Sequence, residues 1–306
     1  MNPPVSGILP IDKAAGVTSH DVVALVRRHL QAAPVGHGGT LDPAAVGVLL
    51  ILIGEATKLM PYVSDQQKEY VVTVRFGITT DTQDLEGRRL SEAPVPAFTR
   101  QDIERLAGRF VGRIRQVPPM YSAVHHQGRR LYELAREGRE VARQAREVVV
   151  HSIVVEAVEP PVARLRVVCG KGTYVRALAA DIGEALGCGA VVERLERVRV
   201  GAFQRDAAVS SADVTKIPPA TLWSRVAPPE SALTGWSAVS LDAAGARRFV
   251  NGQPAATDRT ESSPILVAVH ESGGPLLGVG ELTCAGTVKP VRVLHADRPG
   301  ARVLPA

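Results

Sequence analysis

Val35-Gly-His-Gly-Gly-Thr-Leu-Asp-Pro43 is the stretch of this sequence around which the rest is best interpreted. Its three closely spaced glycines permit backbone angles that other residues avoid, and it ends in a carboxylate, Asp42, placed directly before a proline. Asp followed by Pro is a common helix start with the aspartate as N-cap, and that geometry could also hold Asp42 in place. A chemical role for Asp42 therefore depends on the rest of the chain.

Composition indicates a globular protein with an anionic partner. The chain has 306 residues, 45% of them hydrophobic, enough for one sizeable domain and a smaller one. Its 36 Lys and Arg residues against 31 Asp and Glu residues give a net charge of +5. Arg supplies 30 of the 36 cations, and its planar guanidinium suits phosphates and bases. A GC-rich genome would also enrich Arg, so this support is weak.

Cysteine content and hydropathy exclude several classes of protein. Three cysteines, at positions 169, 188 and 284, show no metal-ligand spacing, so we expect no disulfide framework, no metal site and a cytoplasmic location. Residues 1–10 lack the pattern of a signal peptide, and the longest apolar run, 44–53, is too short to span a bilayer. No membrane role is expected.

Hydrophobic periodicity predicts helices and strands on both sides of the Gly-rich loop. Thr18-Ser-His-Asp21 is a capping-box pattern, followed by helical spacing to residue 30. Residues 68–76 alternate as a strand and place Tyr70 on its apolar face, either as a core tyrosine or as a lid over a planar ligand. We further expect strands at 46–53, 148–158, 165–169 and 191–200, and helices at 55–60, 131–141 and 175–186.

The sequence around certain charged residues limits the roles that these residues can have. Arg176 falls in the first turn of a predicted helix, where a cation opposes the helix dipole, so it either tolerates that cost or has an anionic partner. The loop Asp81-Thr-Gln-Asp84 does not fit a calcium spacing, and its carboxylates are interpreted as acceptors that shape the loop or contact ribose or Arg. Residues 12–16 are predicted to form a turn that places Lys13 near the start of the chain, either as a solvated surface lysine or as a lysine with a function.

The region 105–146 carries ten Arg and three Glu, interleaved with tyrosines and two adjacent histidines. A charge run is usually a solvated face, but this mixture is typical of an insertion that grips phosphates and stacks on bases. Residues 216–231 are rich in Pro and Ser and are predicted to be a linker. A compact β-rich domain is expected at 232–306, with a helix at 241–250 and strands at 265–269, 276–282 and 288–294.

Taken together, these stretches resemble the bacterial TruB family of tRNA pseudouridine synthases in five motifs that occur in the same order. The matching segments are 36–43, 68–70, 81–84, 116–123 and 172–176. One match would be weak, whereas five in order are specific. The resemblance, which runs through most of residues 7–205, implies an α+β catalytic domain (1–215) around a mixed, largely antiparallel sheet, an RNA-gripping insertion and a C-terminal PUA-like RNA-binding module.

By this resemblance, Asp42 is the catalytic aspartate, Tyr70 stacks on the target base and abstracts its proton, and Arg176 pairs with the aspartate. The remaining residues are assigned to RNA or substrate binding. They are His37, Lys13, Lys68, Tyr174, Leu195, Tyr121, His125, Arg129 and Arg130.

The reaction of this family accounts for these residue types. Uridine becomes pseudouridine when its C1′–N1 bond breaks and the base rejoins through C5. A carboxylate can attack covalently or stabilise charge at C1′, a guanidinium keeps it ionised, and an aromatic ring offsets part of the cost of base flipping. No metal, nucleotide or redox cofactor is required. The expected partner is the tRNA T stem-loop, with uridine 55 as target, and we expect a monomer with no obligate protein partner.

Three departures from the family pattern leave the proposed catalytic positions unchanged. His37, which matches a histidine that moves as RNA docks, is followed by Gly38 where the family usually has Thr, so a looser loop is expected before RNA binds. His125 stands where Lys is common, which predicts RNA affinity that weakens as pH rises through the histidine range. Asp12-Lys13-Ala14 replaces a common Asn-Lys-Pro.

Three alternative functions remain open. The first is an RNA-binding or tRNA-folding protein in which Asp42 is only a helix cap. The second is an enzyme of the same class acting on ribosomal RNA or directed by a guide RNA. Residues 1–35 and those after 295 contain no long basic extension of the kind expected for a scaffolded enzyme, which favours a stand-alone tRNA enzyme. The third is a glycosylase that releases free uracil and leaves an abasic product.

Overall fold

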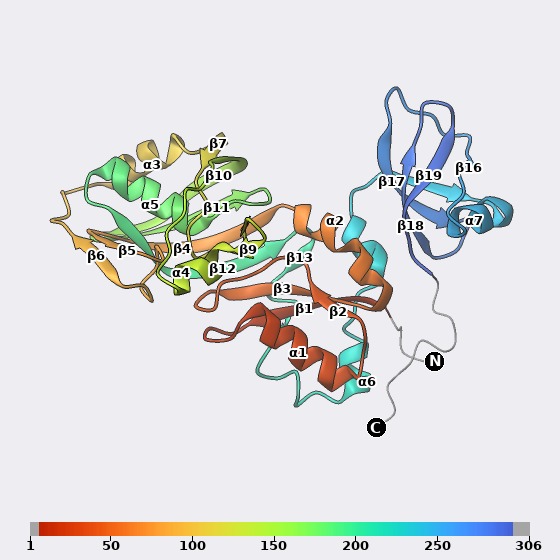
Figure 1. The fold of residues 1–306 in the computed structure, drawn as a ribbon, viewed down its shortest axis with the longest axis horizontal. Coiled ribbons are helices and arrows are strands. Elements are labelled where there is room, and N and C mark those ends of the chain that lie inside the picture. The colour runs from red at the N-terminus through yellow and green to blue at the C-terminus, as the bar shows by residue number, and fades with distance from the viewer. Residues whose placement is uncertain (1–5, 296–306) are drawn as a thin grey trace. The chain divides into compact units, whose positions relative to one another are not determined.

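The computed structural model describes residues 6–295, which form two compact units (Figure 1). Within the described residues, the first unit contains residues 6–43, 48–64 and 201–295, and the second contains residues 44–47 and 65–200. The end of the predicted C-terminal module, 296–306, lies outside the described residues. Within residues 6–295 no helix is long and apolar enough to cross a membrane, and no group of His, Cys, Asp or Glu could hold a metal ion.

The first unit combines the N-terminal part of the chain with its C-terminal part. Its elements are β1 (Gly7–Lys13), α1 (Ser19–Leu30), β2 (Val35–His37), β3 (Val46–Ile53, which begins in the second unit), η1 (Gly54–Leu59), α2 (Met60–Asp65), β13 (Phe203–Gln204), β14 (Val209–Ser210), α6 (Pro219–Trp223), η2 (Pro229–Leu233), β15 (Ala238–Leu241), α7 (Ala243–Val250), β16 (Ala255–Ala256), β17 (Ile265–Glu271), β18 (Leu276–Leu282) and β19 (Thr287–Val293).

Helix α1 and a few strands make the core of the N-terminal part. Strand β1 lies between β14 and β3 and is parallel to β14, while β2 runs antiparallel to β3 with His37 opposite Ile51. The predicted capping box is present: the Thr18 hydroxyl accepts from the Asp21 amide, and the Asp21 carboxylate accepts from the Thr18 amide. The apolar stripe of α1 packs on β1 and β3, so the helix predicted here is confirmed.

The segment expected to be a linker, 216–231, has structure of its own. It contains α6 and the start of η2, and Leu222 is buried in the same core as α1. Ala227 exchanges two backbone hydrogen bonds with Ile8 of β1, each 2.8 Å long. Its apolar residues are too few and too irregularly spaced for periodicity to reveal that they are buried.

The C-terminal part of the first unit is the small β-rich module expected from sequence. Its strands lie in the order β15-β17-β18-β19-β16, and all neighbours are antiparallel except β15 and β17. Asp242 caps α7 by accepting from the Gly245 amide at 2.7 Å, and Phe249 of this helix is fully buried against the strands. Gly278 is required in β18, because a Cβ there would lie 1.9 Å from the carbonyl oxygen of Arg292.

The second unit is built on an antiparallel sheet against which two helices pack. Its elements are β4 (Lys68–Phe76), β5 (Ile78–Thr80), β6 (Arg89–Glu92), α3 (Arg100–Gly108), β7 (Gly112–Gln116), β8 (His125–His126), β9 (Arg129–Arg130), α4 (Leu131–Arg136), β10 (Arg146–Glu159), β11 (Val162–Cys169), α5 (Val175–Leu186) and β12 (Ala190–Val200). Helices α3 and α5 pack against these strands and against each other.

The strand order in this sheet is β12-β4-β11-β10-β7, with every neighbour antiparallel. The first residues of β3 add a short parallel pairing to β12, where Gly47 stands opposite Arg197. A Cβ at position 47 would lie 2.2 Å from the Arg197 carbonyl oxygen, so only glycine fits there. These parallel and antiparallel pairs together confirm the mixed, largely antiparallel α+β fold.

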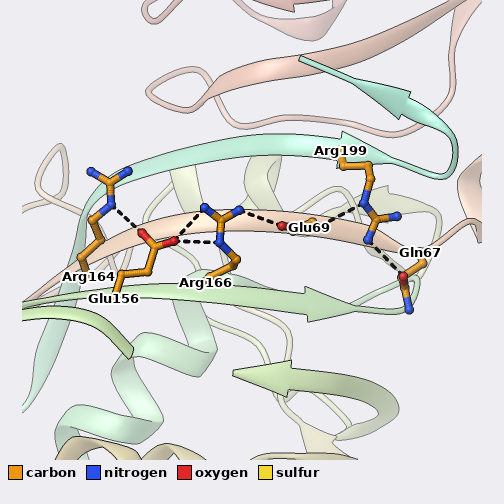
Figure 2. Close-up of polar contacts among 6 residues, drawn as sticks. All are labelled: Gln67, Glu69, Glu156, Arg164, Arg166 and Arg199. Carbon is orange, nitrogen blue, oxygen red and sulfur yellow. Dashed lines mark hydrogen bonds and ion pairs between the residues drawn. The ribbon is translucent and has the colours of Figure 1, made fainter. Parts of the chain in front are cut away.

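Strand β4 shows the predicted alternation between the two faces of its sheet. Its even-numbered residues, 70–76, are buried, whereas the opposite face carries a row of charged side chains (Figure 2). The Glu69 carboxylate accepts from Arg166 at 2.7 Å and from Arg199 at 3.0 Å, and Glu156 accepts from Arg166 at 2.7 Å. This row connects β12, β4, β11 and β10 and ends at Arg164, which donates to Glu156.

The insertion has a small core of its own. Met120, Leu131 and Leu134 are buried together, with neighbouring apolar side chains packed against them. Helix α4 ends at Arg136 rather than at the predicted residue 141, because Gly138 takes a left-handed conformation (φ 71°) and turns the chain. The insertion therefore has an apolar core as well as the charged groups predicted from sequence.

Candidate active site

The loop that carries Asp42 is held on both sides by other groups of the first unit. The Ser19 hydroxyl accepts from the Leu41 amide at 2.9 Å and donates to the Leu41 carbonyl at 3.1 Å. Beyond Asp42, the Pro43 carbonyl accepts from the Gly16 amide at 3.0 Å. Asp42 is half-buried between these two anchors. Its carboxylate is therefore mounted on a fixed backbone, as a reacting group must be.

The helix start considered for Asp42 from sequence is absent, whereas the strand predicted from Val46 is present. After Pro43 the chain bends and enters β3 at Val46, so the Asp42 carboxylate caps no helix. The physical reason lies at the Pro43 carbonyl, which is already bound by the Gly16 amide and by the ammonium of Lys13. It is not available to begin a helical ladder of hydrogen bonds.

Lys13 is fully buried, so the surface position considered from sequence is wrong, while its contact with RNA stays a prediction. Its ammonium donates to three carbonyl oxygens, of Ala14 at 2.9 Å, Val17 at 2.8 Å and Pro43 at 3.0 Å. An ammonium is tolerated in the interior only when its donors are satisfied in this way. Lys13 therefore ties the turn between β1 and α1 to the residue that follows Asp42.

Gly38 is tightly packed, contrary to the looser loop expected from its missing side chain. Its amide donates to the Leu50 carbonyl at 2.8 Å. The place of a Cβ at Gly38 is occupied by α2, since that atom would lie 2.3 Å from Cγ1 of Val63. Next to it, His37 is half-buried at the end of β2, with Nδ1 3.4 Å from the Gly39 amide.

In the second unit, Tyr70 lies on β4 opposite Val167 of β11 and Arg197 of β12. Its side chain is 7% exposed, and that of Arg197 is 2% exposed. Leu195 is half-buried two residues before Arg197, and alternation places both on the face that carries Tyr70. Nothing in the sequence marks Arg197 as buried, because it belongs to a run in which charged and apolar residues alternate.

Lys68 is also buried, at 8% exposure. Its ammonium donates to the Gln66 carbonyl at 2.7 Å. Burial, with the nearby charge of Arg197, lowers the pKa of Lys68 to about 8. The Lys68 ammonium is therefore mostly enclosed by the protein, and its contact with RNA stays a prediction.

Arg176 occupies the first turn of α5, as predicted, and is 4% exposed. Its Nη1 donates to the Thr82 carbonyl at 2.6 Å, its Nη2 donates to the Tyr121 carbonyl at 2.8 Å, and its Nε lies 4.0 Å from Oδ2 of Asp84. The predicted anionic partner is thus present in Asp84, which offsets the unfavourable helix dipole. Asp84 also accepts from the Thr82 hydroxyl at 2.6 Å, the loop-shaping role expected of it.

Gln116 contributes to the geometry of the site in a way that the sequence did not indicate. It is 2% exposed at the end of β7, and its side-chain amide binds both the backbone N–H and the carbonyl of Tyr174. Tyr174 is the N-cap residue of α5, so Gln116 fixes the start of the helix that carries Arg176. The only sequence signal was its position as the first residue of the 116–123 motif.

His125, Arg129 and Arg130, which were also assigned to RNA, lie on the hairpin of β8 and β9. His125 and Arg130 are exposed cross-strand neighbours. Arg129 is exposed but forms a two-bond ion pair with Glu137, and the Arg130 guanidinium lies 5.9 Å from the centre of the Tyr132 ring. His125 and Arg130 are therefore the members of the predicted set that are best placed to meet a phosphate.

The fold and the family matches of this chain define a pseudouridine synthase. Residues 27–175 match the family model of the TruB family pseudouridylate synthase N-terminal domain, residues 176–234 that of the tRNA pseudouridylate synthase B C-terminal domain, and residues 237–294 that of the pseudouridine synthase II TruB C-terminal domain. The chain belongs to the TruB family.

Relatives of known name and a solved structure agree with this membership. The tRNA pseudouridine synthase B of Chromohalobacter salexigens is 42% identical, over 95% of each chain. That of Pseudomonas aeruginosa is 40% identical, over 95% of this chain and 97% of its own. The crystal structure of a Cbf5-Nop10-Gar1 complex contains a similar chain, with a TM-score of 0.74, 25% identity and coverage of 94% of this chain and 85% of that one.

Proposed function

We propose that this enzyme isomerises uridine 55 in the T loop of tRNA, with Asp42 as the catalytic carboxylate, Tyr70 as the stacking ring and Arg176 as the guanidinium that keeps the carboxylate ionised. The observation that most supports the proposal is the doubly anchored backbone of Asp42. A carboxylate accelerates a reaction at a carbon atom only when it is held in an attack position. The relatives named tRNA pseudouridine synthase B support tRNA as the substrate.

In the proposed reaction the target base is flipped out of the RNA stack and held against Tyr70. The C1′–N1 bond breaks as the Asp42 carboxylate either attacks C1′ or stabilises the positive charge that develops there. The retained uracil turns and its C5 bonds to C1′; where the Asp42 carboxylate had attacked, its bond to C1′ breaks in this step and the carboxylate is released. The C5 proton then passes to Tyr70, directly or through water, and N1 gains a proton. Bonds and protons balance, so the isomerisation consumes no co-reactant.

The remaining predicted residues would recognise the RNA around that uridine. The exposed hairpin of β8 and β9 is proposed to grip the phosphates of the T stem-loop, with the protein acting as a monomer in the cytoplasm. The groups proposed to contact RNA or to line its path are His37, Tyr121, His125, Arg129, Arg130, Tyr174 and Leu195.

The test is incubation with a tRNA transcript that carries tritium at uridine C5. Release of tritium from the T loop is expected with the wild-type protein, and Asp42→Asn should reduce its rate by about a thousandfold or more while RNA binding persists. Asp206→Asn, the same change at an exposed position, serves as the matched control. If Asp42→Asn released tritium as fast as the wild type, Asp42 would not be the catalytic residue. Tritium release from another RNA instead of the tRNA T loop would refute the proposed substrate. An abasic product would identify the protein as a glycosylase.

A further inference from the structure

The segment formed by η1 and α2, residues 54–65, contacts the start of the C-terminal module through an aromatic pair. The ring of Tyr62 meets the ring of Trp236 edge to face, with centroids 5.3 Å apart and planes at 77°. This geometry is the favourable one for two aromatic rings. Trp236 is half-buried just before β15, so the contact is made where the C-terminal module begins.

The same segment also binds the end of that module through hydrogen bonds. The Lys58 ammonium donates to the carbonyl of Val293, the last residue of β19, at 3.0 Å. The Glu55 carboxylate accepts from the backbone amide of His295 at 2.8 Å and from Lys58 at 2.6 Å. Residues 54–65, which we name the bridge segment, therefore contact the described part of the module (232–295) near its first and near its last residues.

Elsewhere the bridge segment packs on the loop that leads to Asp42. A Cβ at Gly36 would lie 2.7 Å from Cε of Met60, and a Cβ at Gly38 would lie 2.3 Å from Cγ1 of Val63. Both side chains belong to α2 and occupy the space that the two glycines leave open. A displacement of α2 would therefore move the backbone on either side of His37, because close-packed groups transmit displacement.

We propose that the C-terminal module positions the Asp42 loop through the bridge segment, with Tyr62 and Lys58 as positioning residues that act through Met60 and Val63. The inference rests on the proposed catalytic role of Asp42. The inference gives the module a second role besides binding RNA. The module holds α2 in position, and the loop that leads to Asp42 packs on α2. Loss of this support leaves the carboxylate less well placed for attack and so lowers kcat, with no direct effect on RNA binding.

The first experiment compares Tyr62→Ala with Tyr62→Phe in the full-length protein. An edge-to-face pair contributes about 0.5–1.5 kcal/mol, so Tyr62→Ala is expected to lower kcat about two- to tenfold with KM for tRNA unchanged. It should also speed the hydrogen exchange of the backbone amides at 36–42. Tyr62→Phe keeps the ring contact and is expected to restore both properties.

A second pair of variants covers the case in which Tyr62→Ala does not fold. Lys58→Met removes the hydrogen bond to Val293 and the ion pair with Glu55, and the Lys58 side chain is 36% exposed. The matched control is Lys216→Met, which removes an ion pair of the same spacing, between Lys216 and Asp213. Faster exchange at 36–42 and lower kcat in Lys58→Met, but not in Lys216→Met, would support the inference.

Two outcomes would overturn the inference. One is a raised KM with unchanged kcat and unchanged exchange, which would limit the module to binding RNA. The other is wild-type behaviour in both bridge variants. Failure of the proposed function is detected separately: Asp42→Asn would then keep full activity, while the exchange of residues 36–42 would still report whether the bridge segment holds the loop.

Discussion

The side-chain amide of Gln116 binds the backbone of Tyr174 with two hydrogen bonds. The Tyr174 N–H donates to Oε1 at 2.7 Å, and Nε2 donates to the Tyr174 carbonyl at 3.0 Å. The donor and acceptor of a buried amide are thereby both satisfied in one contact, which joins the end of β7 to the first turn of α5. Arg176 is two residues further on, so its position depends on this contact.

Replacing Gln116 with Leu should therefore reduce both stability and activity. The Tyr174 N–H would lose its bond to Gln116 in a partly buried site, which costs up to about 1–3 kcal/mol in the free energy of unfolding. If α5 then shifts, kcat should fall more than KM for tRNA rises. Chemical denaturation and tritium-release kinetics measure the two effects. Gln101→Leu, the same change at an exposed position of α3, is the control, and equal behaviour of the two variants would contradict the prediction.

The contact between Gly38 and Val63 predicts a pair of substitutions that compensate each other. Gly38→Thr installs the residue usual in the family but brings Cβ to 2.3 Å from Cγ1 of Val63, a stiff β-branched side chain. Such overpacking costs about 1–3 kcal/mol and should reduce activity by displacing the Asp42 loop. Val63→Ala removes the opposing methyl group, so the double variant should recover much of the loss. A double-mutant cycle with purely additive free energies would show that the two residues do not interact.

The sequence predicted best those features that depend on neighbouring residues. The capping box of Thr18 and Asp21 and the alternation through β4 are each contained in a short stretch, and both are confirmed. The start of a helix at Asp42 had the same local logic but is absent, because Lys13 and Gly16 occupy the Pro43 carbonyl. The preference of a short stretch for a helix is overridden when groups from elsewhere in the chain bind the backbone atoms that the helix would use.

The site was less predictable because its contacts join distant parts of the chain. Gln116 and Tyr174 are 58 residues apart, and nothing near either residue indicates their two hydrogen bonds. Lys13 and Lys68 resemble surface lysines in sequence, since only the folded backbone supplies the carbonyls that bind them. The family motifs predicted which residues to examine, but not which of them are buried.

The charged row on the sheet predicts a loss of stability in acid. Burial alone would raise the pKa of Glu69, but hydrogen bonds from Arg166 and Arg199, and their charges, outweigh it and hold the pKa below the ordinary 4.5. Because the folded pKa is the lower one, this stabilisation is present in full above pH 4.5 and disappears as pH falls through the folded value. Urea unfolding from pH 7 to pH 3 should show the wild-type advantage over Glu69→Gln shrinking only at the acid end.

The control for the charged row is Glu86→Gln, which changes an exposed glutamate in the same unit. It should leave the dependence of unfolding free energy on pH close to that of the wild type. A constant difference between wild type and Glu69→Gln down to pH 3 would mean that the ion pairs of Glu69 do not stabilise the fold.

His125 predicts that RNA affinity depends on pH. Its imidazole is exposed opposite Arg130, so a protonated ring adds a positive charge to the hairpin that is proposed to bind phosphate. A histidine ring loses that charge as pH rises through the histidine range, and Kd for a T-loop RNA should then increase about two- to fivefold, the size of an exposed charge contact. His125→Lys should bind the RNA tightly, and its Kd should not change over this pH range. His125→Gln should bind the RNA weakly, and its Kd should not change either. Anisotropy titrations from pH 5.5 to 8 separate these cases. If the wild type and His125→Lys show the same pH profile, His125 does not contact phosphate, and any dependence that remains belongs to another histidine.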